Sequence, residues 1–167
     1  QQMIADVPIG AFLSGGIDSS IITSLMQSNS TQKIKTFTIG FNQEDFNEAQ
    51  HAKAVAAHLQ TDHSELYIDS HDLLSVIPRL PELYDEPFGD SSQIPTYLIS
   101  RFAKENVTVA LSGDGGDELF GGYNRYQITR KYWSTLKMVP PALRSMLARG
   151  ILALSPNTVE KIYSSLA

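Results

Sequence analysis

Short apolar runs alternate with amphipathic stretches along the first two thirds of the chain. The apolar runs are rich in β-branched and aromatic residues and end at glycine or polar clusters, which predicts buried strands over residues 7–14, 35–41, 63–68 and 107–112. Between them, apolar residues recur at helical spacing, which predicts helices over residues 17–28, 46–60, 70–77 and 94–106. The segment 78–92 is dense in Pro, Asp and Gly, and is predicted to be a loop with at most one helical turn.

This alternation predicts an α/β fold, with a parallel twisted sheet that carries helices on both faces. The tail predicts a helical C-terminal extension, with helices over residues 142–153 and 157–166. Two glycine-rich passages, residues 14–20 and 112–118, each follow a predicted strand. Because ligands bind outside the carboxyl ends of the strands in such sheets, we expect both passages to open onto the same side.

Composition narrows the classes of function. The 167 residues carry a net charge of −5, which argues against a nucleic-acid or membrane-surface partner. No apolar run approaches the ~20 residues that span a bilayer. No charged-then-apolar leader is present, so a cytoplasmic location is expected. The absence of cysteine excludes disulfides, thiolate metal sites and a cysteine nucleophile within these residues.

The first passage, SGGIDSS, combines features of an anion site. Gly15 and Gly16 let the backbone approach a ligand closely, and the predicted helix from residue 17 presents unpaired N–H groups. Three serine hydroxyls add donors for phosphate oxygens: Ser14, Ser19 and Ser20. The Asp18 carboxylate would repel a bound phosphate unless a divalent cation lay between the two groups. The alternative, that Asp18 and Ser19 merely cap the helix, stays open.

The second passage, SGDGGDE, places three carboxylates within five residues: Asp114, Asp117 and Glu118. They would repel one another unless a cation or a shared proton relieved the repulsion. A solvated acidic turn is the alternative interpretation.

Other phosphate and nucleophile motifs do not fit. A Walker loop needs a lysine, and none occurs between Ile4 and Gln32. In a dinucleotide fingerprint starting at Gly113, the third glycine is replaced by Glu118. A hydrolase elbow around Ser112 would need glycines where Ala110 and Asp114 stand.

The two passages carry a family resemblance. SGGIDSS resembles the pyrophosphate-binding loop of the ATP-pyrophosphatase (PP-loop) superfamily. ALSGDGGDELFGGYNRY, together with VPIGAFLSGGIDSS, FTIGF and YDEPFGDSSQIPTYLIS, resembles the synthetase domain of the glutamine-dependent asparagine synthetase family. The resemblance runs from about Ala5 to Arg125 and implies an adenine nucleotide alpha hydrolase-like fold. It implies that a substrate carboxylate attacks the α-phosphate of ATP, releasing pyrophosphate, and that ammonia then displaces AMP to leave an amide.

The resemblance also implies roles for individual residues. The positions that match the ATP and pyrophosphate site are Leu13, Ser14, Gly15, Gly16, Asp18, Ser19, Ser20, Ile39, Ser112 and Gly113. Asp18 and Asp117 match carboxylates that act with Mg²⁺, and Asp114 matches a position that accepts a proton during amide formation. Candidates for the substrate end are Asp90, Ser91 and Arg125. For Asp90 and Ser91 the alternative is a helix cap, and for Arg125 an ordinary surface position.

Two departures from the family pattern matter. Asp114 stands where asparagine synthetases commonly have glutamate, and in this it resembles relatives that amidate other carboxylates. The expected acceptor is therefore aspartate or a related small carboxylic acid. The family's glutaminase domain, which supplies ammonia, and its late catalytic lysine are not identifiable in these residues. We therefore expect a synthetase core over 1–133, a truncated helical part of the same domain over 134–167, and a glutaminase domain elsewhere in a longer protein.

Two other functions stay open. One is a different PP-loop ATP pyrophosphatase, and the other is a non-catalytic nucleotide-binding module. A homodimer is a further expectation.

Overall fold

The computed structural model describes residues 2–41, 47–86, 89–155 and 158. The chain divides into two compact units, Gln1–Asp117 and Glu118–Ala167. No helix in these described ranges is long and apolar enough to cross a membrane.

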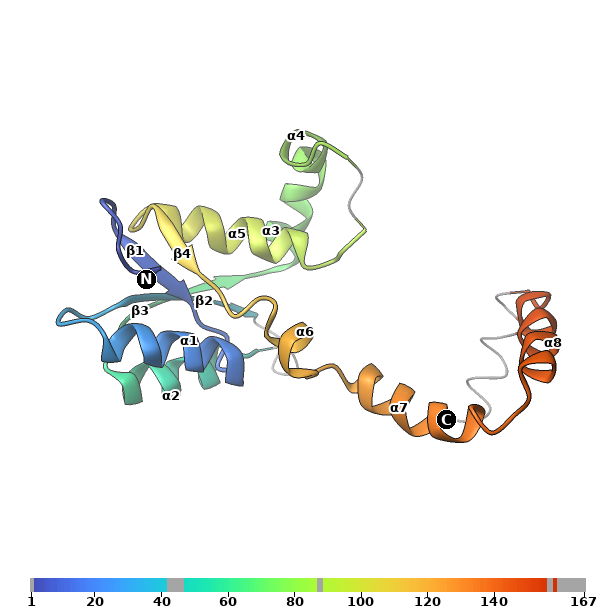
Figure 1. The fold of residues 1–167 in the computed structure, drawn as a ribbon. Coiled ribbons are helices and arrows are strands. Elements are labelled where there is room, and N and C mark those ends of the chain that lie inside the picture. Colours follow the sequence, from blue (N-terminus) through green and yellow to red (C-terminus); the bar gives the residue numbers. More distant parts are fainter. Residues whose placement is uncertain (1, 42–46, 87–88, 156–157, 159–167) are drawn as a thin grey trace. The chain divides into compact units, whose positions relative to one another are not determined.

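The first unit contains a four-stranded parallel sheet (Figure 1). The strands are β1 (Ile9–Phe12), β2 (Lys35–Phe41), β3 (Asp62–Ile68) and β4 (Val109–Leu111). Their order is β3-β2-β1-β4, so the chain builds outward from β1 and then returns to its other side. Ala11 of β1 pairs with Thr36 on one side and Leu111 on the other. The loops that follow β1 and β4 are therefore neighbours, at the point where the strand order reverses.

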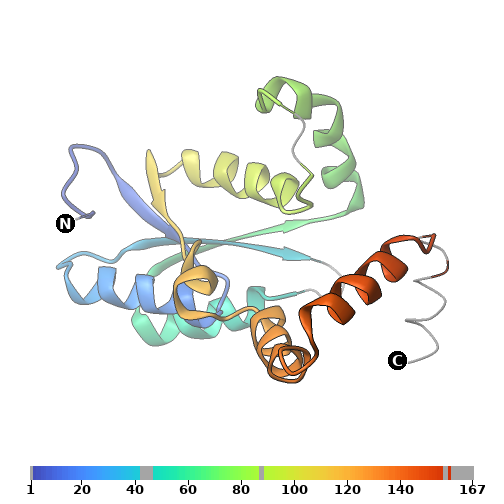
Figure 2. The same cartoon turned by 45° about the vertical axis from the view of Figure 1, so that its right-hand side comes forward.

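Helices cover both faces of this sheet, as Figures 1 and 2 show. On one face lie α1 (Ile17–Ser28) and α2 (Ala49–Leu59), and on the other α3 (Ser70–Val76) and α5 (Gln93–Lys104). This confirms the predicted α/β class. The bounds of α1 and β2 also agree with the sequence pattern.

Alternate strand residues pack against opposite layers. Ala11 packs with Met26 of α1, and Leu13 packs against α2. Phe37 points to the other face, where its ring meets that of Phe102 edge to face, with centroids 5.8 Å apart. Because both faces are covered, both sets of alternating residues are buried in β2, where Thr36 and Thr38 face one side and Phe37 the other.

The segment 78–92 contains more helix than predicted. Ile77–Arg79 form the 3-10 helix η2, and Leu80–Leu83 form α4, so the expectation of at most one helical turn is wrong. Pro78 and Pro81 lie within the first two positions of these elements. A proline there removes no hydrogen bond and presets the helical φ, so prolines did not exclude helix.

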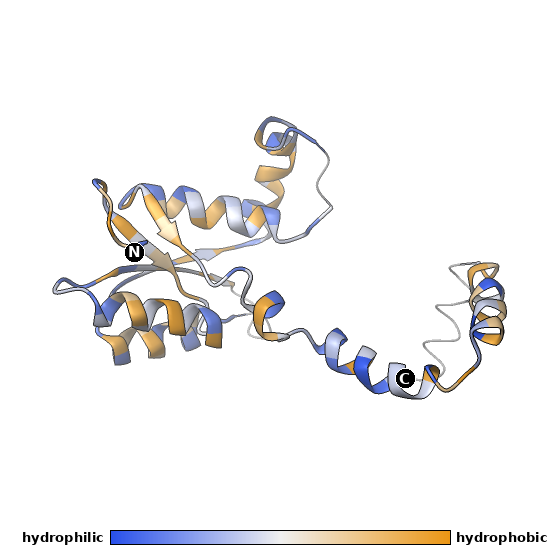
Figure 3. Ribbon diagram, in the orientation of Figure 1, coloured by the Kyte–Doolittle hydropathy of each residue, from blue (hydrophilic) through white to orange (hydrophobic). Residues whose placement is uncertain are grey.

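Two further differences concern the C-terminal third. The second glycine-rich passage turns into a short helix, α6 (Gly116–Phe120), and a helix that was not predicted follows, α7 (Asn124–Leu136). Figure 3 shows that α7 is largely hydrophilic, and none of its residues is buried, so it lacks the apolar periodicity that signals a helix. The helix α8 (Pro141–Leu152) confirms the one predicted over 142–153. The helix predicted over 157–166 lies outside the described residues, apart from residue 158.

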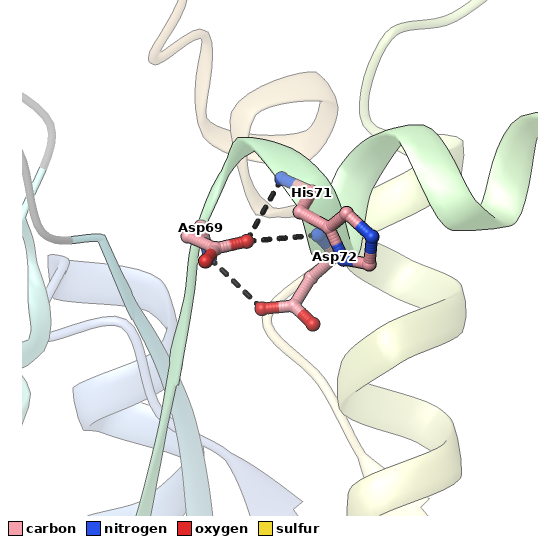
Figure 4. Close-up of side chains that lie close together, drawn as sticks. All are labelled: Asp69, His71 and Asp72. Carbon is pink, nitrogen blue, oxygen red and sulfur yellow. Dashed lines mark hydrogen bonds between the residues drawn. The ribbon is translucent and has the colours of Figure 1, made fainter.

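The start of α3 explains a cluster of Asp69, His71 and Asp72 (Figure 4). Asp69 Oδ1 accepts hydrogen bonds from the backbone N–H groups of His71, at 2.8 Å, and Asp72, at 2.9 Å. Asp72 Oδ2 accepts a bond of 3.0 Å from the backbone N–H of Asp69. The hydrogen bonds that Asp69 accepts lower the pKa of its carboxyl, and the bond from the backbone N–H of Asp72 has the largest effect. The cluster is a capping box, and the carboxylates are used by the helix end itself.

One buried polar chain crosses the α2 face of the sheet. The Thr36 hydroxyl lies 2.9 Å from both Thr61 Oγ1 and His63 Nδ1. His63 Nε2 is buried and has no hydrogen-bond partner among the described residues. Burial lowers the pKa of His63, outweighing the nearby Glu65 carboxylate. The fold therefore favours a neutral imidazole here.

Acid is expected to weaken the fold through His63. The pKa of His63 is lower in the folded protein than in the unfolded chain, so His63 of the unfolded chain binds a proton more readily. The stability contributed by neutral His63 is complete above about pH 6.5 and declines as the pH falls below it. Urea unfolding between about pH 7.5 and about pH 5.5 should show this decline, and it should be smaller in His63→Gln. The matched control is His58→Gln, at an exposed position on α2. An unchanged decline in His63→Gln would contradict the assignment.

Candidate functional site

A cleft of about 380 Å³ lies at the carboxyl ends of β1, β2 and β4. Its lining residues come from the end of β1, both glycine-rich passages, the second half of β2, the residue before α2 and the first half of α5: Phe12, Leu13, Ser14, Gly16, Asp18, Ser19, Thr38, Ile39, Phe41, Glu48, Pro95, Thr96, Ile99, Ser112, Gly113 and Asp114. The expectation that the two passages open onto the same side of the sheet is confirmed.

Serine hydroxyls hold the first passage in shape. The hydroxyls of Ser14 and Ser19 lie 2.9 Å apart, and Ser19 Oγ also accepts the backbone N–H of Ser14 at 3.2 Å. Ser20 Oγ donates to the carbonyl of Gly16 at 2.7 Å. These bonds close the loop on itself and fix the direction in which α1 begins.

The start of α1 presents unpaired donors. The first bond of its helical ladder runs from the N–H of Ser20 to the carbonyl of Gly16, at 3.1 Å. The N–H groups of residues 17–19 precede that bond, and the N-cap residue Gly16 has no side chain to receive them. Neither Asp18 nor Ser19 accepts a bond from these groups, so the capping alternative is not what the described residues show. The helix start retains the donors and dipole of an anion site.

Glycines let the two passages touch. A Cβ at Gly113 would lie 2.8 Å from the backbone nitrogen of Ser19, and one at Gly116 would lie 2.5 Å from Cγ of Asp18. Both distances are shorter than real Cβ contacts, so only glycine fits without movement. Gly15 has a φ of +82°, and a Cβ there would lie 2.7 Å from the backbone nitrogen of Ala52 in α2. The glycines therefore allow the second passage to pack against the start of α1, and the first passage to pack against α2.

A methyl group at position 113 should open this contact. In Gly113→Ala the new carbon meets backbone atoms of α1, so the loop or the helix start must shift. Overpacking of this kind costs about 1–3 kcal/mol. Binding of inorganic pyrophosphate with Mg²⁺ to the full-length protein, measured by calorimetry, should weaken at the same time. Gly89→Ala is the control, since its Cβ would have no atom within 4 Å. Affinity equal to wild type in Gly113→Ala would contradict an anion site at this contact.

Among the described residues, those that line the cleft and are charged are all acidic: Asp18, Glu48 and Asp114. Asp114 is exposed, and its Oδ2 accepts a hydrogen bond of 2.9 Å from Ser112 Oγ. Asp117 is half-buried and is not a lining residue, although its neighbour Gly116 lies against Asp18. Asp18 and Asp117 have no hydrogen bond or ion pair with other side chains in the described part of the chain. Carboxylate oxygens left free on two touching loops fit Mg²⁺ in type, because magnesium prefers oxygen ligands.

Other predicted site residues lie elsewhere. Gly15 and Ser20 line an apolar groove between α1 and α2 instead of the cleft. Asp90 and Ser91 are exposed and do not line the cleft. The Asp90 carboxylate accepts the backbone N–H of Ser92 at 2.8 Å, which lowers its pKa and shapes the turn before α5.

Arg125 belongs to the second unit. Its guanidinium carbon lies 4.1 Å from the centroid of the Tyr123 ring. The Tyr123 hydroxyl donates to Glu118 at 2.7 Å, and this bond lowers the pKa of Glu118. The cation is thus held within a small cluster of its own unit, and a role toward substrate stays a prediction.

Sequence reasoning did not find seven of the lining residues: Phe12, Thr38, Phe41, Glu48, Pro95, Thr96 and Ile99. Phe41 lies two residues after the predicted Ile39 on β2, so strand alternation could have indicated it. Thr38 lies on the opposite face of the strand from Ile39, so alternation gave no signal for it. Pro95, Thr96 and Ile99 lie on one side of α5, and no local pattern connects that helix with the ends of β1 and β2.

Comparison with known proteins identifies the family that this chain is similar to. The asparagine synthase family model matches residues 1–163. A relative from Methanocaldococcus jannaschii is 46% identical over 123 residues, covering 73% of this chain and 24% of the relative. Asparagine synthetase [glutamine-hydrolyzing] 1 from Bacillus subtilis is 41% identical over 145 residues, covering 87% of this chain and 23% of its own length. The chain thus spans about a quarter of the length of these relatives.

A solved structure is also similar. The NH3-dependent NAD synthetase from Campylobacter jejuni has a TM-score of 0.45 and 12% identity, covering 87% of this chain and 84% of the other. A similarity this low does not define the fold further.

Proposed function

Because the chain belongs to the asparagine synthase family, we propose that its cleft binds ATP and supports the formation of an amide from a small carboxylic acid. In this reaction the substrate carboxylate attacks the α-phosphorus of ATP and pyrophosphate leaves. Ammonia then attacks the resulting acyl-adenylate and AMP leaves. The observation that carries the proposal is the contact of the two glycine-rich passages at the unpaired start of α1.

The start of α1 is the place for the pyrophosphate part of ATP. The N–H groups of residues 17–19 point out of the helix end and carry the positive end of its dipole. Ser14 and Ser19 form the loop beside them, and their hydroxyls can turn toward phosphate oxygens. Because these donors are fixed before the reaction, they can stabilise charge that develops on the departing pyrophosphate.

The acidic lining requires a cation when a polyphosphate is bound. ATP beside Asp18 and Asp114 would be repelled without one. Asp18 and Asp117 are the residues that would hold Mg²⁺, as their oxygens are free and lie on the two touching loops. Bound there, the ion would offset negative charge on the phosphates during the displacement.

Asp114 is suited to a later step. Of the three carboxylates of the second passage, it is the one that lines the cleft, and the bond from Ser112 Oγ to its Oδ2 orients it there. We assign it the proton released when ammonia becomes the amide nitrogen. A base within hydrogen-bond reach of the attacking nitrogen is what that step needs.

The remaining components belong to the longer protein. Relatives named as glutamine-hydrolyzing enzymes support a glutaminase domain as the source of ammonia. Aspartate or a related acid is the proposed acceptor, with Asp90, Ser91 and Arg125 as candidates for contacts to it. We also propose that residues 1–133 form the synthetase core and that residues 134–167 are a helical part of the same domain. A homodimer and a cytoplasmic location are proposed as well.

The test is product analysis with full-length protein. ATP, Mg²⁺, glutamine or ammonia, and a panel of small carboxylic acids that starts with aspartate should yield an amide, AMP and pyrophosphate in equal amounts. An enzyme that makes AMP and pyrophosphate with a different acceptor would be another PP-loop pyrophosphatase. Nucleotide binding with no turnover for any acceptor would leave only a binding module.

A further inference from the structure

An apolar groove of about 700 Å³ lies between α1 and α2, apart from the cleft. Its lining residues come from these two helices and from the first glycine-rich passage: Gly15, Ile17, Ser20, Ile21, Ser24, Leu25, Ala54, Val55, His58 and Leu59. The buried residues of α1 are a different set, which includes Thr23 and Met26. The helix α1 thus has a second apolar side besides the one that packs on the sheet.

The large side chains on this second side of α1 are exposed. Ile17 is 78% exposed, Ile21 51% and Leu25 59%. They follow one another at intervals of four residues, so they form one continuous apolar ridge along the helix. Single exposed apolar residues need no explanation, but a contiguous apolar surface in a protein of this kind indicates an interaction site.

The groove is almost free of charge. His58 is the only ionisable residue in its lining. Charged groups at an interface speed the encounter of partners and choose between them, whereas permanent interfaces are more apolar. The chemistry of the groove therefore fits a partner that stays bound.

The size of the relatives indicates where a permanent partner comes from. The chain spans about a quarter of the length of the relatives that it matches, so most of a protein of that size lies outside these 167 residues. A segment of the same polypeptide is present at a high effective concentration and remains attached. A second copy fits less well, because a two-fold dimer buries the same patch on both subunits and would set groove against groove.

We propose that the groove between α1 and α2 is an interface within the longer protein, filled by an apolar segment from outside these 167 residues. The bound segment would touch Gly15 and Ser20, so it would also support the first passage. The proposal rests on the exposed surface of α1 and on the family, and does not depend on ATP binding in the cleft.

Photo-crosslinking of the full-length protein tests the proposal. With benzoylphenylalanine in place of Ile21, irradiation should attach this position to a peptide from outside the 167 residues. The product should have the mass of one polypeptide. A product of two polypeptides would show a second copy or a foreign partner. Attachment only to residues 1–167 would show that the chain covers its own groove, and no attachment would show an open groove. Each of these three results would overturn the proposal.

A charge at the same position gives a second measurement. If the groove is filled, Ile21→Asp places an unpaired carboxylate against apolar groups, so the urea midpoint of the full-length protein should fall. The matched control is Ile21→Leu, which keeps an apolar side chain of similar volume and should unfold at about the wild-type midpoint. An unchanged midpoint in Ile21→Asp would overturn the proposal even if the crosslinking variant did not fold.

Discussion

Replacing Asp18 by alanine is expected to abolish the stabilisation of the full-length protein by ATP or pyrophosphate with Mg²⁺. At about 100 times its dissociation constant, a ligand raises the free energy of unfolding by about 2.7 kcal/mol. Asp18 is the second residue of α1 and touches the second passage at Gly116, so its carboxylate lies where a cation would meet the phosphates. Without it, the phosphates and the remaining carboxylates repel one another. Thermal unfolding with and without ligand measures the effect.

Whether Asp18→Ala weakens or strengthens pyrophosphate binding in the absence of Mg²⁺ is a sharper test. In metal-free buffer Asp18 only repels an anion, so Asp18→Ala should bind pyrophosphate at least as well as wild type. The control is Asp6→Ala, at an exposed position outside the cleft, which should keep the full shift. Loss of pyrophosphate binding both with and without Mg²⁺ would mean that Asp18 supports the loop and not a cation.

Asp117→Asn and Asp114→Asn are expected to fail at different steps. Asp117 is proposed to act with the metal, so Asp117→Asn should weaken nucleotide binding and suppress pyrophosphate release together. Asp114 is proposed to accept a proton in the ammonia step, so Asp114→Asn should retain nucleotide binding. Its amide formation should fall by about 10²–10⁴-fold, the usual contribution of a general base. Exchange of labelled pyrophosphate into ATP, with acceptor but no ammonia, isolates the first step.

The exchange measurement shows whether Asp114 and Asp117 have different roles or act in one site. Retained exchange with lost amide in Asp114→Asn supports the division. If Asp114→Asn abolishes exchange as completely as Asp117→Asn, both carboxylates belong to one metal and nucleotide site. Ser112→Ala removes the hydroxyl that bonds to Asp114 Oδ2, so a smaller loss in the same direction is expected.

The layers of the first unit could be predicted because their residues are buried on both sides. Phe37 and Ala11 face opposite helix layers, so the strands carry short runs of apolar and β-branched residues, and β1 and β4 are each followed by a glycine-rich passage. The meeting of the two passages followed from topology, since the carboxyl ends of parallel strands share one edge. The close approach of Gly113 and Gly116 to α1 gives those glycines a steric reason that sequence alone did not supply.

What escaped prediction depends on tertiary packing or on a missing periodic signal. Glu48 and Ile99 reach the cleft from elements whose own patterns say nothing of β1. The helix α7 has a polar surface and no buried residue, so no apolar stripe marked it. Pro78 and Pro81 suggested a loop, yet near a helix start proline is compatible with helix.

The cleft is proposed to direct a carboxylate to the α-phosphorus of ATP. This attack is tested most directly by following a heavy oxygen label from the acceptor carboxylate through one turnover of the full-length protein. An acyl-adenylate transfers one labelled oxygen to AMP when ammonia displaces it, so mass spectrometry should find the label in AMP, with unlabelled pyrophosphate. Label in inorganic phosphate, with ADP as the nucleotide product, would contradict the claim, because the attack would then have been at the γ-phosphorus.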